Sequence, residues 1–360
     1  MSNSPMARLL NNPVCFLGEA EHDGGVAISS RIRLARNLAE FPFPPAAAPE
    51  QLTAIRDLVA DTVQRSRMLG AGAFRFDVAD LPTLEQEILF ERRLVSRDFL
   101  NNPAAGALLA KADESVSLMV NEEDHLRLQA FAPGFALEEV WQVIDKVDTK
   151  LESKFNFAFD DTLGYLTSCP TNAGTGMRAS VMLHLPGLVM TGQIAPLVQG
   201  AAKLNLAVRG AYGEGPENQG DLYQISNQAT LGESEAEIIE HLSCVIRQII
   251  SFELQARETV QKKDRNNLCD LVGRAYGLLR HAYTLSLAEA LQALSCLRLG
   301  VTLNMFRSVD VARVNHLWVH TNPAHLNKLA GHPLSGAEAD VERARLFRET
   351  LAGLQAKQGC

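Results

Sequence analysis

Residues 121–125 read Asn-Glu-Glu-Asp-His and separate two alternating apolar segments, 115–120 and 126–131, which are predicted to be strands. Three consecutive carboxylates repel one another, so a cation beside them would lower their free energy. The sequence therefore offers a carboxylate site for a cationic group. A solvated turn explains the same run equally well, because runs of charge are usually exposed. Arg127 follows His125 by two positions, so both side chains are expected on one face of the second strand.

A second motif, residues 167–178, reads Thr-Ser-Cys-Pro-Thr-Asn-Ala-Gly-Thr-Gly-Met-Arg. We expect a strand, a glycine-containing loop and then a helix from about Met177, an arrangement whose backbone N–H groups bind anions. A dinucleotide fingerprint would need an acidic residue about 20 positions further on, but no Asp or Glu lies between Thr162 and Tyr212. That acid-free stretch indicates the electropositive side of a site, since its basic residues are Arg178, Lys203 and Arg209.

Two further segments carry arginine in patterns that suit phosphate. Arg31 and Arg33 lie two positions apart on an expected strand, so both point to one face and could grip a polyphosphate. A solvent-exposed basic strand explains them equally well. Residues 209–215 read Arg-Gly-Ala-Tyr-Gly-Glu-Gly, a flexible loop with one Arg and one Glu. Taken alone, this loop is better explained as ordinary surface.

Cys169 fits two interpretations. It could be a thiol whose pKa is lowered at a helix N-terminus, or a small buried apolar residue. The order of Ser, Cys, His and Asp residues does not indicate acyl transfer. The chain also lacks the Walker-A sequence and the protein-kinase motifs, which excludes the commonest ATP-binding folds.

The composition narrows the class of protein further. The chain has 360 residues, 46% of them hydrophobic, and a net charge of −8, which argues against a direct nucleic-acid role. Its six cysteines form no paired motif, so we expect neither a disulfide framework nor a zinc site. We therefore expect the protein in a reducing cytoplasm. We find no signal peptide and no run of about 18 apolar residues, so neither export nor a membrane span is expected.

The expected elements define an α+β catalytic domain over about 1–260 and a small helical domain over 261–360. Periodicity predicts helices at 50–69, 83–95, 136–154 and 234–265, and strands at 115–120, 126–131, 164–168, 204–208 and 222–226. The helical tail is rich in apolar positions. We interpret them as a surplus that forms a homodimer and docks partner proteins, although packing against the helix at 234–262 would also use them; they are Leu278, Leu279, Leu287, Leu291, Leu294 and Leu297.

Taken together, these motifs resemble the ATP:guanido phosphotransferases, the family of arginine and creatine kinases, and within it the bacterial branch that acts on arginine residues of proteins. The match covers roughly residues 25–260. It rests on Ser-Ser-Arg-Ile-Arg-Leu-Ala-Arg-Asn at 29–37, the motif at 121–127, the Cys-Pro-Thr-Asn-x-Gly-Thr-Gly-x-Arg stretch at 169–178, and Arg-Gly-x-x-Gly-Glu at 209–214. The resemblance implies an antiparallel sheet flanked by helices, with ATP and Mg²⁺ as the cofactors.

The resemblance also implies roles for single residues. Glu123 would be the carboxylate nearest the reacting guanidinium nitrogen, and Glu214 the second carboxylate, carried by the loop. Glu122 and Cys169 would lie in the environment of the substrate guanidinium. The ATP-binding residues would be Arg31, Arg33, Arg127, Arg178 and Arg209, together with Ser30, His125 and Asn172. No protein ligand of a metal is implied.

Two departures from the family pattern affect the expected substrate and regulation. Small-molecule members carry about a hundred helical residues before the first Arg motif, which here begins by residue 31, so we expect a site open enough for a polypeptide. Bacterial relatives carry Arg-Asp-x-x-Arg-Ala near the C-terminus to sense phosphoarginine, but Ala339 replaces the leading Arg. The sequence therefore leaves open whether the C-terminal domain senses phosphoarginine at that position. An activator protein and protein-quality-control protease partners are also implied by the resemblance.

Two alternative functions also fit the sequence. The first is a kinase of free arginine or another small guanidino metabolite, against which the short N-terminal region argues. The second is a non-catalytic adaptor that binds arginine-rich or phosphoarginine-bearing proteins. An adaptor of this kind would have lost catalysis. The chain retains the two Glu and five Arg to which the resemblance gives catalytic and ATP-binding roles, which argues against such a loss.

Overall fold

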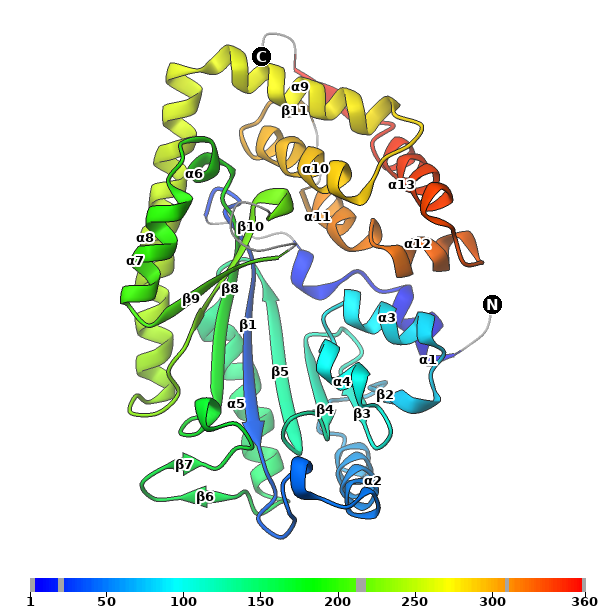
Figure 1. Ribbon diagram of the computed structural model, residues 1–360, viewed down its shortest axis with the longest axis vertical. Helices are drawn as coiled ribbons and strands as arrows, with labels where there is room; N and C mark the ends of the chain where they lie inside the picture. Colours follow the sequence, from blue (N-terminus) through cyan, green and yellow to red (C-terminus); the bar gives the residue numbers. More distant parts are fainter. Residues whose placement is uncertain (1–3, 19–22, 212–217, 308–310, 358–360) are drawn as a thin grey trace. The chain divides into compact units, whose positions relative to one another are not determined.

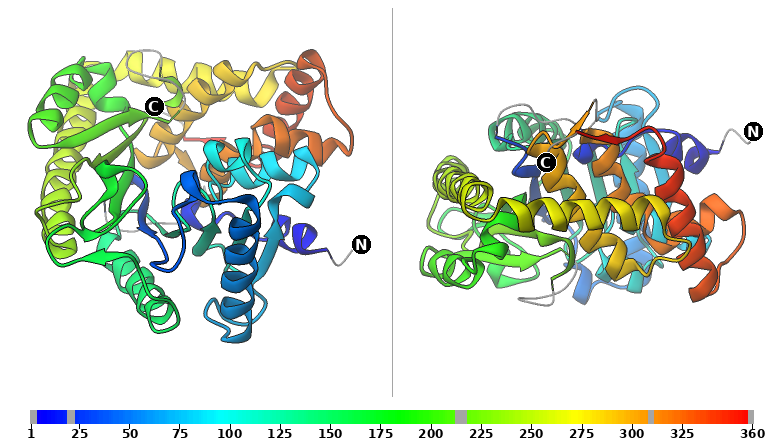
Figure 2. Two further views of the ribbon diagram at one scale, coloured as in Figure 1. Left: turned by 60° about the horizontal axis from the view of Figure 1, so that its bottom comes forward. Right: turned by 90° about the horizontal axis from the view of Figure 1, so that it is seen from above.

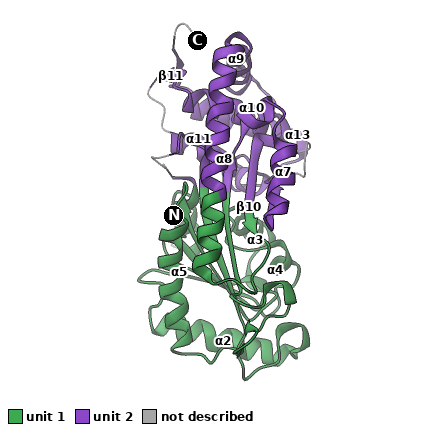
Figure 3. Cartoon of the chain, turned by 90° about the vertical axis from the view of Figure 1, so that its left-hand side faces the viewer, with its two compact units in different colours: residues 1–16, 29–181, 226–244 green, residues 17–28, 182–225, 245–360 purple. Residues whose placement is uncertain are grey.

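The computed structural model describes residues 4–18, 23–211, 218–307 and 311–357 (Figure 1). Contacts along the chain divide it into two compact units, each assembled from separate stretches of sequence (Figure 3). Unit 1 consists of residues 1–16, 29–181 and 226–244. Unit 2 consists of residues 17–28, 182–225 and 245–360.

The main sheet has eight strands in the order β2-β3-β4-β5-β1-β8-β10-β9. The pairs from β2 to β1 are antiparallel, which confirms the expected α+β fold with an antiparallel sheet. The strands are β1 Ala27–Arg36, β2 Phe74–Asp77, β3 Ala107–Ala110, β4 Val116–Val120, β5 Leu126–Pro133, β8 Met177–His184, β9 Leu206–Gly210 and β10 Leu222–Asn227. A separate hairpin pairs β6 (Phe159–Asp160) with β7 (Gly164–Tyr165).

Strand β1 separates an apolar face from a basic face. Side chains alternate along a strand, so Ile32 and Leu34 are fully buried on one face while Arg31 and Arg33 lie on the other. In the register of β1 with β5, Ala35 is opposite Arg127. Cross-strand partners share a face, so the guanidiniums of β1 and β5 lie on the same side of the sheet.

Helices of unit 1 cover the sheet with amphipathic faces. Helix α2 (Pro49–Arg65) packs on β3 and β4 and buries Ile55, Val59 and Val63, as its helical spacing predicts. Helix α5 (Leu137–Glu152) packs on β5. It begins on the face opposite the arginines, because the hydroxyl of Ser30 accepts a hydrogen bond from Ala136 N at 2.9 Å. The remaining helices of this unit are α1 Pro5–Leu10, α3 Thr83–Glu91 and α4 Arg97–Asn101.

Unit 2 is dominated by helices, seen from two further directions in Figure 2. Helix α10 contacts α9, α11 and α13 and is buried along most of its length. A capping box in which Ser286 and Glu289 bond reciprocally begins it. The helices are α6 Pro186–Met190, α7 Ile194–Lys203, α9 Arg265–His281, α10 Leu287–Thr302, α11 Val311–His320, α12 Pro323–Ala330 and α13 Gly336–Thr350; β11 Phe306–Arg307 pairs with β12 Gln355–Ala356, and α8 Glu235–Lys263 runs from unit 1 into unit 2.

The prediction of a helix from about Met177 is wrong, because residues 177–184 form strand β8. Nearly every position of this strand is buried on both faces, so its sequence shows neither alternation nor a helical period. The loop before it therefore does not open a helix. A helix N-terminus as the source of an anion site is excluded there.

Most of the leucines interpreted as an interface are core residues instead. Leu279, Leu291, Leu294 and Leu297 are fully buried within the helical tail, whereas Leu278 is 40% exposed. Those four residues therefore provide no argument for a dimer. Among the described residues, no helix is long and apolar enough to cross a membrane.

Candidate active site

The acidic segment 121–125 forms the tight connection from β4 to β5. Asn121 has a φ of 60°, and its N–H donates to the carbonyl of His125 at 2.8 Å. Its side-chain amide donates to the carbonyls of Leu52 and Ala105, at 2.7 and 2.9 Å. Asp124 is 2% exposed and His125 is fully buried. The segment is thus held rigidly, and a solvated turn does not describe it.

The two glutamates of this turn have different surroundings. The Glu122 side chain is buried and accepts hydrogen bonds from the Arg127 guanidinium and from Ser96 Oγ, the latter at 2.5 Å. The Glu123 side chain is 41% exposed, and its Oε2 lies 3.7 Å from Nη2 of Arg127. Burial raises the pKa of the Glu123 carboxyl; Arg127 opposes the rise, and Asp124 and Glu122 add to it. Of the two carboxylates, Glu123 is the one accessible to a cationic group.

Four of the five predicted phosphate-binding arginines gather on unit 1. Arg31, Arg33 and Arg127 share one face of β1 and β5, and Arg178 lies on the neighbouring strand β8. Burial, followed by the charges of Arg93, Arg127 and Arg178, lowers the pKa of Arg31 to about 9. Burial is the largest cause of this shift, and the three arginine charges that add to it indicate positive groups close enough to repel one another. A polyphosphate between them would relieve that repulsion.

Arg93 belongs to the same cluster, and the sequence did not single it out. It follows α3 with a φ of 59°, and its charge is the first after burial to lower the pKa of Arg31. Its guanidinium also lies over the ring of Phe16, 5.2 Å from the centroid. Arg93 occurs in an ordinary Glu-Arg-Arg sequence at a helix end. Nothing in its spacing separates it from a surface residue.

The loop with Cys169 is joined to the acidic turn by hydrogen bonds. Asp124 Oδ1 accepts from Ser168 N at 2.7 Å and from Asn37 Nδ2 at 2.6 Å, which links the loop to the end of β1. Asn172 Nδ2 donates to Glu123 Oε2 at 3.3 Å. Cys169 Sγ is partly exposed and contacts Thr171 Oγ1 at 3.0 Å. The structural role of Asp124 and Asn37 was not foreseen from the sequence.

Two residues expected to contact ATP are fully engaged by the protein. Ser30 Oγ donates to Gly134 O at 2.9 Å and accepts from Ala136 N. His125 Nδ1 accepts from Leu38 N at 3.1 Å, and its Nε2 lies 3.0 Å from Pro42 O. A contact with ATP would require one of these bonds to open. We therefore propose that both residues hold the backbone around the site.

Two predicted residues remain, Arg209 and Glu214. Arg209 is an exposed residue at the end of β9, in unit 2. Glu214 lies outside the described residues. Across the described ranges, no group of three or more His, Cys, Asp or Glu side chains is arranged to hold a metal ion.

Comparison with known proteins agrees with this geometry. Residues 56–256 match the family model described as ATP:guanido phosphotransferase, C-terminal catalytic domain. The chain belongs to the ATP:guanido phosphotransferase family. Residues 265–359 match a second model, described as Protein-arginine kinase McsB C-terminal domain.

Two relatives that are similar along nearly the whole chain are both named protein-arginine kinase. A protein-arginine kinase of Caldanaerobacter subterraneus subsp. tengcongensis is 46% identical over 92% of this chain and 98% of that protein. A protein-arginine kinase of Moorella thermoacetica is also 46% identical, over 91% of this chain and 94% of that protein.

Solved structures support the fold. The duplicated taurocyamine kinase of Schistosoma mansoni, with bound transition-state analogue components, aligns with a TM-score of 0.59 at 21% identity. That alignment covers 73% of this chain and 40% of the taurocyamine kinase. A lombricine kinase aligns with a TM-score of 0.54 at 23% identity, covering 69% of this chain and 73% of the other. At these identities the likeness concerns the fold alone.

Proposed function

We propose that the chain is a protein-arginine kinase, which transfers the γ-phosphoryl group of ATP to the guanidinium of arginine residues in proteins. Its family and the names of its relatives support this activity. One geometric observation carries it independently. Arg127 contacts Glu122, lies 3.7 Å from Glu123, and is opposite Ala35 of β1, on the face that carries Arg31 and Arg33. A carboxylate suited to the acceptor thus adjoins a guanidinium cluster suited to ATP.

Glu123 would supply the chemistry at the acceptor. A guanidinium is a poor nucleophile while protonated, because its pKa is above 12. The Glu123 carboxylate would bind it by charge-assisted hydrogen bonds, orient one nitrogen and accept the proton from it. The N–P bond forms as the bond from the γ-phosphorus to the β,γ-bridging oxygen breaks, and ADP leaves. The raised pKa of Glu123 makes it a better proton acceptor than an ordinary glutamate. We propose Glu214 as the second carboxylate.

The arginine cluster would bind and orient ATP. Phosphoryl transfer needs charge neutralisation and in-line positioning more than covalent help, and an array of guanidiniums supplies both. Mg²⁺ supplies further neutralisation of the phosphates when bound. It usually binds through phosphates and water, in keeping with the finding that, in the described part of the chain, no three His, Cys, Asp or Glu side chains are arranged to hold a metal ion. We propose ATP contacts for Arg31, Arg33, Arg127, Arg178, Arg209 and Asn172, and also for Arg93, whose charge acts on Arg31.

The choice between a protein and free arginine can be tested with a pair of peptides. One carries a single Arg and the other a Lys at the same position; both are incubated with the chain, Mg²⁺ and γ-labelled ATP, next to free arginine. We expect label on the Arg peptide and none on the Lys peptide. Transfer to free arginine alone would favour a metabolite kinase. Binding of the Arg peptide without any transfer would favour an adaptor.

We also propose a homodimer formed by residues 261–360, with the catalytic domain ending near residue 260. The two family matches, which end at 256 and begin at 265, support this boundary. Helix α9 supports the interface, since Leu271 and Leu278 are 37% and 40% exposed along it. Light scattering tests this: the full chain should be dimeric, and the pair Leu271→Glu and Leu278→Glu should make it monomeric. A monomeric full chain would contradict the proposal.

A cytoplasmic location, an activator protein and protease partners are further proposals. The location is supported by the cysteines, because the five that lie within the described ranges are all free thiols. The partners rest on the family resemblance.

A further inference from the structure

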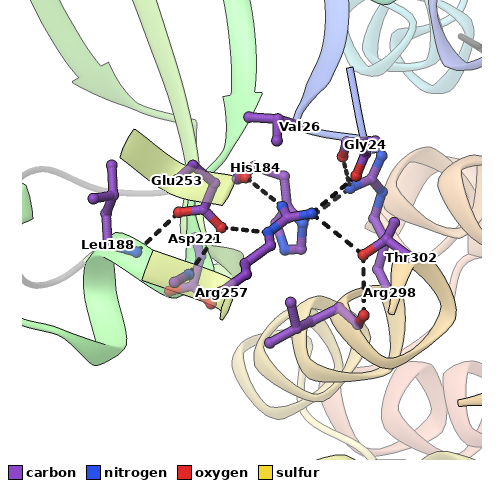
Figure 4. Close-up of polar contacts among 12 residues, drawn as sticks. Gly24, Val26, His184, Leu188, Asp221, Glu253, Arg257, Arg298 and Thr302 are labelled. Atoms are coloured by element: carbon purple, nitrogen blue, oxygen red, sulfur yellow. Dashed lines mark hydrogen bonds and ion pairs between the residues drawn. The ribbon is translucent and has the colours of Figure 1, made fainter. Parts of the chain in front are cut away.

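Unit 2 contains a buried polar network that the proposed reaction does not use (Figure 4). Asp221 ends the short 3-10 turn Gln219–Asp221, directly before β10. Its Oδ2 accepts a hydrogen bond from Ser295 Oγ of α10 at 2.5 Å, and Ser295 Oγ also lies 2.8 Å from Nε2 of His184. Nδ1 of His184 lies 2.9 Å from Nη1 of Arg298. All four side chains are at most 5% exposed.

The hydrogen bonds of this network all point in one direction, from Arg298 through His184 and Ser295 to Asp221. A guanidinium can only donate, so Nδ1 of His184 accepts from Arg298 and the ring proton is on Nε2. That N–H donates to Ser295, whose own hydroxyl proton is then directed at Asp221. Burial, Arg298 and Arg257 lower the pKa of His184 well below its usual value, in keeping with a neutral ring. Such a satisfied chain of hydrogen bonds specifies one arrangement of the groups it joins.

The backbone at Asp221 needs such support. Gly220 has a φ of 81° and Asp221 a φ of 53°, which is unusual for a residue other than glycine. A Cβ on Gly220 would lie 2.5 Å from the ring of Trp318 in α11. The carbonyl of Asp221 accepts from Leu185 N at 2.9 Å. A residue other than glycine keeps a positive φ only where surrounding contacts hold it there. Here helices α10 and α11 provide those contacts.

The segment held in this way is tied to Arg209. Leu222 follows Asp221, and its carbonyl accepts from Ala211 N at 2.9 Å and from Asn218 Nδ2 at 2.9 Å. Ala211 is two residues beyond Arg209. A shift of Asp221 would therefore move the residue that fixes the end of β9.

We propose that Asp221 and Ser295 are positioning residues, through which the C-terminal helix α10 holds Arg209 in place for ATP. The inference rests on the proposed function, since the contact between Arg209 and ATP belongs to it. If the network only stabilises the fold, its loss should lower the melting temperature. The loss of ATP affinity should then be no larger than in another variant that is destabilised to the same extent.

The test compares three variants of the full chain. Ser295→Ala removes the central hydroxyl, and Asp221→Asn keeps an oxygen acceptor and a residue type that tolerates a positive φ. Ser243→Ala, the matched control, removes another buried serine hydroxyl, on α8 and outside the network. ATP affinity is measured by titration, backbone amide exchange by mass spectrometry, and stability by thermal unfolding. None of these measurements requires turnover.

We expect Ser295→Ala to raise the Kd for ATP about tenfold, the equivalent of one charge-assisted contact. In the same variant, amide exchange should rise within residues 206–225. Asp221→Asn and Ser243→Ala should stay near wild type in both ATP affinity and amide exchange. If Ser295→Ala matches Ser243→Ala in ATP affinity and exchange, the proposal is overturned. If the wild-type chain makes no phosphoarginine while Ser295→Ala still weakens ATP binding, the proposed substrate fails and the positioning role is supported.

Discussion

The side-chain amide of Asn172 donates a hydrogen bond to Oε2 of Glu123 across 3.3 Å. The two residues come from separate motifs, 49 positions apart in the sequence. Their contact brings the loop with Cys169 to the acidic turn between β4 and β5. A guanidinium bound by Glu123 would therefore lie beside that loop, so each motif can be tested through the other.

Replacing Glu123 by Gln should remove phosphoryl transfer and leave ATP binding intact. The side chain would still fit, but it could no longer accept a proton, and loss of a positioned base typically costs about 10²–10⁴-fold in rate. Initial rates of ADP release and a nucleotide titration measure the two effects. Turnover within a few-fold of wild type would refute the role of Glu123.

Replacing Asn172 by Ala should move the acid limb of the rate profile to higher pH. Glu123 acts as a carboxylate, so activity falls as the pH drops through its pKa, which burial already raises above 4.5. The bond from Asn172 stabilises the charged carboxylate and lowers that pKa. Its removal therefore raises the pKa further. The profile of kcat/KM, followed by ADP release, checks the sign; a shift to lower pH contradicts the account.

Replacing Arg178 or Arg93 by Ala should weaken ATP binding and lower the rate together. Each change removes a charge-assisted contact to phosphate worth about 1.5–3 kcal/mol, so the Kd should rise roughly 10- to 150-fold. Lys203→Ala is the matched control, because Lys203 is an exposed cation in the same acid-free stretch of sequence. Unchanged affinity in Arg93→Ala would remove that residue from the cluster. Equal losses in Lys203→Ala would show only a general effect of charge.

Replacing Gly220 by Ala should destabilise the fold more than Gly232→Ala does. Both glycines have positive φ, 81° and 92°, so both replacements incur backbone strain. At Gly220 the new Cβ would also meet Trp318 at 2.5 Å, whereas nothing lies within 4 Å at Gly232. The steric overlap adds about 1–3 kcal/mol. Urea unfolding compares the two; equal losses would show that the contact with Trp318 does not matter.

The sequence predicted the parts of the fold that carry clear periodicity. Strands β4 and β5 alternate, and α2 repeats its apolar residues at helical spacing, so each was found near its observed bounds. Strand β8 was mistaken for a helix, since a strand buried on both faces has no period of two. Strands β2 and β3 have only four residues each, too few for a pattern to show.

The site, like the fold, could be predicted only where the local sequence carries a pattern. The motifs around Glu123 and Cys169 were recognisable because unusual residue types occur together. Arg93 and Asp124 have their positions from tertiary contacts alone: the carbonyl of Arg93 accepts a hydrogen bond from Gln129 of β5, and Asp124 bonds to Asn37 and Ser168. Neither contact leaves a local signal in the sequence.

Phosphosite mapping tests the central claim most directly. The full chain is incubated with ATP, Mg²⁺ and a generic protein rich in arginine, and the products are examined by mass spectrometry under conditions that preserve the acid-labile P–N bond. Glu123→Gln serves as the control. We expect phosphate on arginine side chains of the protein with the wild-type chain and none with the variant. Phosphate on free arginine only, on hydroxyl side chains only, or on no product at all would contradict the account.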